Sequence, residues 1–330
     1  MTFNEINDGI WNVYGDHGPG GERNSVYIVM DENIAIIDTG IRNTIQHEIG
    51  ECIDHAGRKS KDVKYIFLTR EHHDAIGGAE KLMQMFPKAE LVCNKDAEDT
   101  IRKPYLYLPE KHFEPNRKGG KFSYEPWERL KGVKPHAVFD DSDKFQLGNT
   151  TIFTICYPGF SAGHSMFFSS KQKAIFTGAE LYIYPMRFSN YLIDLTGSTV
   201  EREKALTFIS RANTDMLCPA YDGAYLGGQA KELIKQALQA HNTFEETILV
   251  TLTTNGASTF EAIKEEVNLS LGIEWYKPWK DLVQDLTLKA HMKQLEEEDK
   301  IFQSSKKRGK EPLWNVHDDA KINPDEVLYY

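Results

Sequence analysis

The stretch LTREHHDAIGG, residues 68–78, has the composition of a tight metal-binding turn from which some ligands are missing. It places two adjacent histidines, His72 and His73, before the carboxylate of Asp74, and it ends in two glycines. Arg70 stands where such a turn would carry an imidazole. Its fixed positive charge opposes a divalent cation, and the Asp74 carboxylate is its natural partner. The turn therefore keeps the outline of a metal site while losing coordinating atoms.

Alternating strand and helix patterns surround this turn. Short apolar runs predict strands, and apolar residues at helical spacing predict helices. The predicted strands cover 25–30, 34–40, 63–69 and 90–94, the helices cover 43–57 and 79–85, and two strand pairs follow over 143–159 and 165–178. This alternation indicates a layered α/β fold in which helices cover a sheet.

The bulk composition is that of an ordinary globular protein. The chain has 330 residues, of which 40% are hydrophobic and 27% are charged, and its net charge is −10. A negative chain is a poor match for nucleic acid, which binds positive surfaces. No apolar run approaches the length of a membrane span, and the N-terminus lacks the features of a signal peptide. The four cysteines are far apart, which argues against disulfides and thiolate metal sites. We expect a cytoplasmic protein.

Residues 104–137 form an aromatic and proline-rich stretch without clear periodicity. One interpretation is an irregular surface insertion that packs on its own side chains. The alternative is a lid or a substrate wall over the mouth of an active site.

The chain becomes helical beyond about residue 240. Two short helices are predicted over 244–256 and 258–267, with Ser258 as the N-cap of the second. A longer helix over 279–302 and a hairpin with its tip at Gly309 follow. This order suggests a winged-helix module. The basic run 306–310 lies at the predicted wing, but the acidic run LEEED directly before it opposes contact with phosphate.

Five segments together resemble the metallo-β-lactamase superfamily in their order and spacing. They read IIDTG, LTREHHDAIGG, YPGFSAGHSMFF, IFTGAELY and CPAYDG. The resemblance implies an αββα sandwich, which we place at 1–240. The C-terminal helices and hairpin, 241–330, resemble the small winged-helix-like domain of one branch of that superfamily.

The resemblance also identifies the positions of the usual ligands to two metal ions. In the family motif HxHxDH the four ligand positions correspond to Arg70, His72, Asp74 and Ala75 of this chain, and His73 falls on a position that is not a ligand. The later ligand positions carry Phe160, Ala179 and Tyr221, and the residues near them are His164, Glu180 and Asp222. Only His72 and Asp74 are therefore retained, and no metal is expected in the usual dinuclear form.

Two alternatives remain for the site. In the first, no cofactor is bound, and His72, Asp74 and Arg70 act alone or only shape the loop, beside a substrate pocket of His73, Phe160, His164, Glu180, Tyr221 and Asp222. In the second, His72, Asp74 and either Glu180 or Asp222 hold a single zinc, iron or manganese ion. His164 is either an acid or base or a structural histidine. Tyr221 either orients a ligand or fills the volume of the lost imidazole. Asp38 resembles the family's buried aspartate, which braces the first metal loop through backbone hydrogen bonds.

Three classes of function follow from these alternatives. In the first class, the chain is a structural or regulatory subunit that has lost the dinuclear centre, and it acts as a homo-oligomer or beside a ligand-complete paralogue. Alternatively, it is a hydrolase of thioester, lactone, ester or ether-type small molecules that uses one rebuilt metal site or metal-free acid and base residues. The third class, a nucleic-acid-binding regulator that uses the basic wing, has the least support.

Overall fold

A computed structural model describes residues 2–17, 23–104, 130–181, 197–272, 280–304 and 311–323. The chain divides into two compact units. The first comprises Met1–Pro158, Ala162–Ala179 and Asn213–Ala230, and the second comprises Gly159–Ser161, Glu180–Ala212 and Lys231–Tyr330. Each unit is described by itself below.

The first unit contains a seven-stranded sheet in the order β1-β2-β3-β4-β5-β6-β7. Its N-terminal strands are antiparallel up to β4, and the pairs β4/β5, β5/β6 and β6/β7 are parallel. The strands are β1 (Phe3–Asn7), β2 (Ile10–His17), β3 (Arg23–Met30), β4 (Ile34–Ile37), β5 (Val63–Phe67), β6 (Glu90–Asn94) and β7 (Ala137–Phe139). Strand β4 is buried along its whole length, as expected for a central strand with both faces covered.

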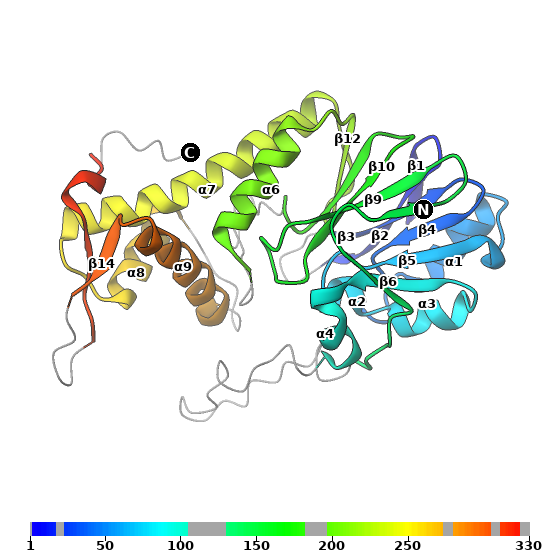
Figure 1. Ribbon diagram of the computed structural model, residues 1–330, viewed down its shortest axis with the longest axis horizontal. Coiled ribbons are helices and arrows are strands. Elements are labelled where there is room, and N and C mark those ends of the chain that lie inside the picture. The colour runs from blue at the N-terminus through cyan, green and yellow to red at the C-terminus, as the bar shows by residue number, and fades with distance from the viewer. Residues whose placement is uncertain are drawn as a thin grey trace. The chain divides into compact units, whose positions relative to one another are not determined.

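A second sheet of the same unit has the order β13-β12-β11-β10-β9-β8. Its strands are β8 (Lys144–Gln146), β9 (Thr151–Cys156), β10 (Ser165–Ser169), β11 (Ala174–Gly178), β12 (Met216–Pro219) and β13 (Tyr225–Leu226). The two sheets face each other (Figure 1) across a core that includes Phe67, Phe139, Phe167 and Phe176. The rings of Phe67 and Phe167 lie 5.0 Å apart between their centroids. The predicted sandwich of sheets is confirmed.

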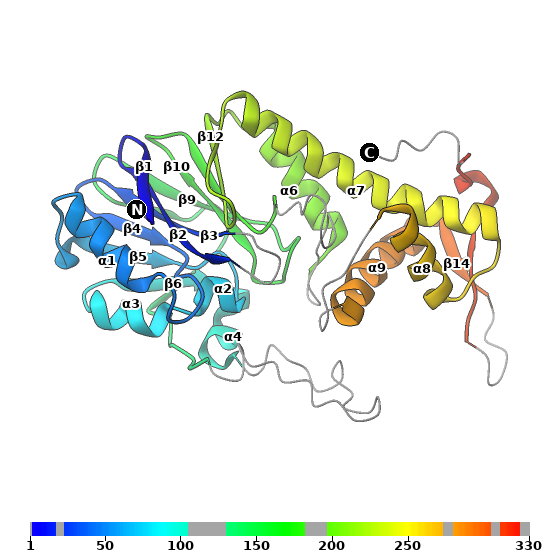
Figure 2. The same ribbon diagram turned by 180° about the vertical axis from the view of Figure 1, so that it is seen from behind.

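Helices cover the outer face of the first sheet (Figure 2). A second core joins Ile49 and Ile53 of one helix and Leu82 of another to Ile28 and Ile36 of the sheet. The helices and short 3₁₀ turns on this side are α1 (Gln46–His55), η1 (Ser60–Asp62), α2 (His73–Ile76), α3 (Ala79–Met85), η2 (Lys95–Ala97) and α4 (Glu98–Arg102). The predicted helix over 79–85 and the strand over 90–94 have the bounds found in the structure.

The second unit is mainly helical and has its own apolar core. It contains α6 (Thr199–Arg211), most of α7 (Gly228–Asn255), α8 (Phe260–Ser270), α9 (Lys280–Glu297), the antiparallel pair β14 (Ile301–Gln303) and β15 (Trp314–Val316), and η4 (Asp318–Ala320). Ile248 and Leu252 of α7 pack in one cluster with Ile263 of α8 and Met292 of α9. Within the described residues, no helix is both long enough and apolar enough to cross a membrane.

Two predictions about this part of the chain are corrected. The segment 244–256 is not a separate short helix, because it is the end of the 28-residue helix α7, in which residue 240 also lies. The N-cap of α8 is Thr259 rather than Ser258, since the Thr259 hydroxyl accepts the backbone N–H of Ala262. The wing residues 305–310 and most of the aromatic stretch 104–137 lie outside the described residues. The winged-helix identity stays a prediction.

Candidate functional site

Asp38 is the residue that fixes the loop after strand β5. It directly follows β4 and has a φ of 64°, a left-handed conformation that Asp adopts more easily than most residues. The Oδ1 atom accepts the backbone N–H of Thr69 at 2.8 Å, and Oδ2 accepts the Thr69 hydroxyl at 2.8 Å. The predicted bracing of the loop through backbone hydrogen bonds is therefore confirmed.

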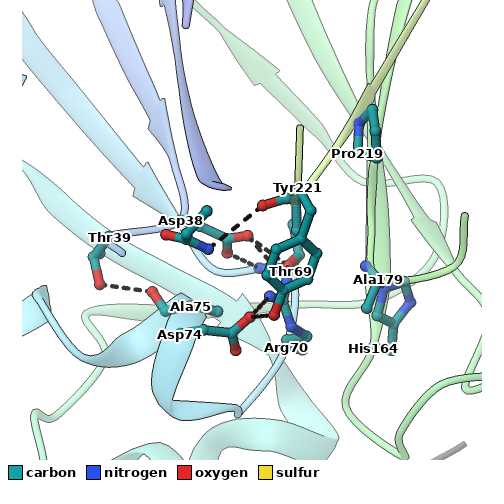
Figure 3. A network of polar contacts seen from close by, with 12 residues as sticks. Asp38, Thr39, Thr69, Arg70, Asp74, Ala75, His164, Ala179, Pro219 and Tyr221 are labelled. Carbon is teal, nitrogen blue, oxygen red and sulfur yellow. Dashed lines mark hydrogen bonds and ion pairs between the residues drawn. The ribbon is translucent and has the colours of Figure 1, made fainter. Parts of the chain in front are cut away.

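Arg70 lies inside the protein and is surrounded by acceptors. Its residue surface is only 1% exposed. The guanidinium donates from Nη1 to Asp38 Oδ2 at 3.3 Å and to Thr69 Oγ1 at 2.8 Å, and from Nη2 to Asp74 Oδ2 through a short hydrogen bond. Asp38 and Asp74 are themselves 3% and 4% exposed. The predicted pairing of Arg70 with Asp74 is confirmed, and Asp38 is a second carboxylate on the same cation (Figure 3).

Tyr221 joins this network from a distant part of the chain. It follows strand β12, and its hydroxyl donates a short hydrogen bond to the same Oδ2 atom of Asp74 that Arg70 contacts (Figure 3). An isolated bridge pairs its backbone with Asn24 of β3. Tyr221 therefore does more than fill the volume of an imidazole, because its hydroxyl bonds directly to the Asp74 carboxylate.

Arg70 and Asp74 hold each other in the ionised state. Burial alone would raise the pKa of Asp74, but Arg70, the two histidines and the Tyr221 hydroxyl together lower it well below its usual value. Burial alone would lower the pKa of Arg70, but Asp74 and Asp38 raise it above the ordinary value. For Asp38, burial raises the pKa, and Arg70 and Thr69 oppose this shift.

The two histidines of the turn lie at the start of the short helix α2. His72 is the N-cap residue, and its carbonyl oxygen accepts the N–H groups of Ala75 and Ile76. Burial lowers the pKa of His73 to about 4, so its imidazole is neutral at pH 7. Ala75, which the resemblance aligns with a ligand position, is fully buried. Its carbonyl oxygen accepts both the N–H and the hydroxyl of Thr39.

The Gly-Gly end of the turn is required by close backbone packing. A Cβ atom on Gly78 would lie 2.3 Å from the carbonyl oxygen of Thr39, and one on Gly77 would lie 2.4 Å from that of His73. Both distances are far below van der Waals contact, so only glycine fits. The glycines let helix α2 and the start of α3 lie directly against the loop that contains Asp38.

His164 has a structural contact in this unit. It is fully buried, and its Nε2 atom accepts the backbone N–H of Ala179 at 3.1 Å. A neutral imidazole that accepts at Nε2 carries its proton on Nδ1. Nearby in sequence, the N–H of Gly163 donates to the buried carboxylate of Glu71 at 3.4 Å. These contacts favour the interpretation of His164 as a structural residue over that of an acid or base.

Phe160 and Glu180 belong to the second compact unit. Glu180 is fully buried, and its Oε1 atom accepts the backbone N–H of Phe160 at 2.9 Å. Arg202 of helix α6 is also fully buried, donates from Nη2 to the Glu180 carbonyl oxygen at 3.1 Å, and places Nε 4.0 Å from the Glu180 carboxylate. Glu180 thus contacts Phe160 and directly follows Ala179, and the resemblance aligns both of these residues with metal-ligand positions.

Glu180 gives a testable pH dependence. Burial raises the pKa of Glu180 from 4.5 to about 7, although Arg202 acts in the opposite direction. A carboxyl group with a raised pKa in the folded state favours folding when protonated, so its contribution is complete below pH 4.5 and is lost as the pH rises through about 7. The glutamine of Glu180→Gln stays neutral at every pH. We therefore expect this variant to lack the fall of about 3 kcal/mol in the free energy of unfolding that the wild type shows as the pH rises from 4.5 through about 7.

Urea unfolding at a series of pH values measures this effect. Glu203→Gln, at an exposed position of the same helix as Arg202, is the matched control and should keep the wild-type profile. A Glu180→Gln profile that superimposes on that of the wild-type protein would contradict the prediction.

The donor set does not fit the dinuclear metal centre that the resemblance implies. Arg70 places a buried cation at one ligand position, and Asp74 Oδ2 already accepts from Arg70 and Tyr221. Among the residues that the structure describes, no three His, Cys, Asp or Glu side chains are grouped so that they could hold a metal ion. Within the described part of the first unit, His72, Asp74 and Asp222 therefore form no such group.

The structure brings together only part of the predicted site. Arg70, Asp74 and Tyr221 are in direct contact, and Asp38 joins them. Asp222 is exposed, and its carboxylate accepts the backbone N–H of Arg23 at 3.2 Å, at the start of β3. The sequence patterns did not indicate Thr69 and Arg202. Thr69 had a signal, since it directly precedes Arg70 in the turn, whereas nothing in the sequence around Arg202 marks it.

The comparisons with known proteins agree with this architecture. The model of the metallo-beta-lactamase superfamily matches residues 18–220. A metallo-beta-lactamase family protein from Thermus thermophilus has a TM-score of 0.73 at 13% identity, with 95% of this chain and 100% of that chain covered. A beta-lactamase domain protein from Burkholderia ambifaria has a TM-score of 0.71 at 15% identity, with 96% and 93% covered.

A hydroxyacylglutathione hydrolase from Francisella philomiragia is 24% identical over 160 residues. The matched region spans 48% of this chain and 48% of that enzyme, so the chain matches about half the length of this relative. The family match covers more than half of the chain, and the structural similarities extend over nearly all of it. The chain belongs to the metallo-β-lactamase superfamily.

Proposed function

We propose that this chain is a superfamily member that works without the dinuclear metal centre, as a structural or regulatory subunit, either as a homo-oligomer or beside a ligand-complete paralogue. The observation that carries the proposal is the buried guanidinium of Arg70, which bonds to Asp38 and Asp74 at the turn where metal ligands belong. A fixed cation at this position repels a divalent ion and uses the carboxylate that would bind it.

Metal analysis of the protein, purified without chelator and without added metal, tests this proposal. We expect far less than one equivalent of zinc, iron or manganese, and the same low content in a His72→Ala variant. The subunit role is tested by co-expression with a ligand-complete paralogue from the same organism, followed by size-exclusion chromatography. About one equivalent of metal that is lost in His72→Ala would contradict the first part, because His72 is a retained ligand position.

A second candidate function is a hydrolase of a small thioester, lactone, ester or ether. The similarity to the Francisella hydroxyacylglutathione hydrolase favours it, and it would use His72, Asp74 and Arg70 or a single rebuilt metal site. Turnover of a hydroxyacylglutathione thioester that falls in Asp74→Asn but not in Asp222→Asn would support this candidate. No described residue favours the nucleic-acid alternative, because the basic wing lies outside the described ranges.

A further inference from the structure

We propose that Arg70 is a built-in cation that takes over the structural work of the metal ions, holding together three chain segments that meet at this site. Metal ions in proteins both neutralise buried carboxylates and join the segments that supply their ligands. The guanidinium of Arg70 has both properties here. The inference rests on the proposed function in one respect, because both assume that the site works without the dinuclear centre.

The first property is charge compensation. Asp38 and Asp74 are almost completely buried, and isolated carboxylates are costly to remove from water. Arg70 contacts both of them, with Nη1 on Asp38 and Nη2 on Asp74. The planar guanidinium has several donors in a fixed arrangement, so one cation can serve two carboxylates in different directions.

The second property is the joining of segments. Asp38 follows strand β4, Arg70 and Asp74 lie in the turn after β5, and Tyr221 follows β12 of the other sheet. Arg70 and Tyr221 donate to the same oxygen of Asp74 (Figure 3). Asp74, held by Arg70, therefore fastens the segment after β12 to the turn. A metal-binding turn makes the same connection through a shared ion and its ligands.

The alternative is that the contacts of Arg70 add nothing to the stability of this unit beyond ordinary packing. Buried ion pairs are frequently replaceable by apolar side chains without loss, so burial alone does not decide between these alternatives. The difference lies in whether the charge of Arg70 is coupled to Asp74 and to Tyr221. A double-mutant cycle measures this coupling directly.

The experiment is urea unfolding of the full chain as wild type, Arg70→Met, Asp74→Asn and the double variant Arg70→Met/Asp74→Asn. Arg70→Met leaves two buried carboxylates without their cation, so we expect the unfolding equilibrium constant to rise by about a hundredfold or more. The double variant should be less destabilised than the sum of the single variants, with a coupling of at least about tenfold in that constant. Tyr221→Phe, which removes only the hydroxyl, should lose most of its effect in the Asp74→Asn background.

Arg70→Lys separates charge from packing. Lysine keeps the positive charge on an unbranched chain similar to that of methionine, but as a point charge it reaches fewer acceptors. We expect the unfolding constant of Arg70→Lys to be at least about tenfold lower than that of Arg70→Met and still higher than that of the wild type. If Arg70→Met does not fold, its unfolding constant cannot be measured. The unfolding constants of Arg70→Lys, Asp74→Asn and Arg70→Met/Asp74→Asn are then compared with one another.

Equal stability of the lysine and methionine variants, or purely additive effects in the cycle, would overturn this inference. If the purified protein is metal-free, such a result overturns only the inference about Arg70, and the proposed function stands. A stoichiometric metal in the wild-type protein would instead overturn the proposed function, whatever the cycle shows. The two failures are therefore distinguishable.

Discussion

Replacing Asp38 with asparagine is expected to lower the free energy of unfolding by about 3–5 kcal/mol, because it removes one charge from a buried, hydrogen-bonded network. The Asp38 carboxylate accepts from the Thr69 N–H, the Thr69 hydroxyl and Arg70. An amide offers only one acceptor oxygen, and its NH₂ group would face donors. Asparagine tolerates the left-handed conformation of this position, so backbone strain adds little to the measured effect.

Asp222→Asn is the matched control for this substitution. Asp222 also has a positive φ, 59°, but it is exposed, and an asparagine oxygen can still accept the N–H of Arg23. We expect a change within about 0.5 kcal/mol for the control. Chemical denaturation of both variants measures the difference, and similar effects at the two positions would show that Asp38 does not brace the loop.

A second large effect is expected for Arg202→Met in the helical unit. Arg202 is fully buried, and its guanidinium contacts the carbonyl and lies beside the carboxylate of Glu180. Removal of one partner leaves the other charge buried without that compensation, which typically costs about 3–5 kcal/mol. We expect a loss of this size in the free energy of unfolding at pH 8, where Glu180, whose pKa is about 7, is mostly ionised.

The loss should be smaller at pH 5, because protonation of Glu180 removes the charge that Arg202 compensates. Arg211→Met is the control, since Arg211 lies at the exposed end of the same helix α6. The double variant Arg202→Met/Glu180→Gln should recover a large part of the stability that Arg202→Met loses at pH 8. Equal losses for Arg202→Met at the two pH values would contradict the assigned pairing with Glu180.

Local patterns predicted strands β3 to β6 and β8 to β11 and helices α1 and α3 of the first unit, whereas strands β1, β2, β7, β12 and β13 and helices α2 and α4 were not predicted. Continuous apolar runs such as VKYIF and ELVCN are typical of strands covered on both faces, and the structure confirms them as β5 and β6. The helical segment 244–256 was predicted too short. Its apolar spacing is visible in the sequence, but no local signal shows that the helix begins as early as Gly228.

The candidate site was predictable where two partners lie close in sequence. Arg70 and Asp74 are four residues apart, and their opposite charges at one turn indicate the ion pair. The roles of Tyr221 and Arg202 were not predictable in this way. Their partners Asp74 and Glu180 are 147 and 22 residues away along the chain, and only the strand order and the position of helix α6 bring them together.

The sequence by itself indicates that Arg70 opposes a divalent cation at the turn, because a guanidinium carries a fixed positive charge. The ligand positions of the turn and the bracing role of Asp38 are what the resemblance to the superfamily implies, on the order and spacing of five short segments. Only the tertiary structure decided which buried atoms face one another. Hydrogen bonds and buried charges depend on distances of a few ångströms between atoms, and Asp74 and Tyr221 lie on segments that are remote in sequence.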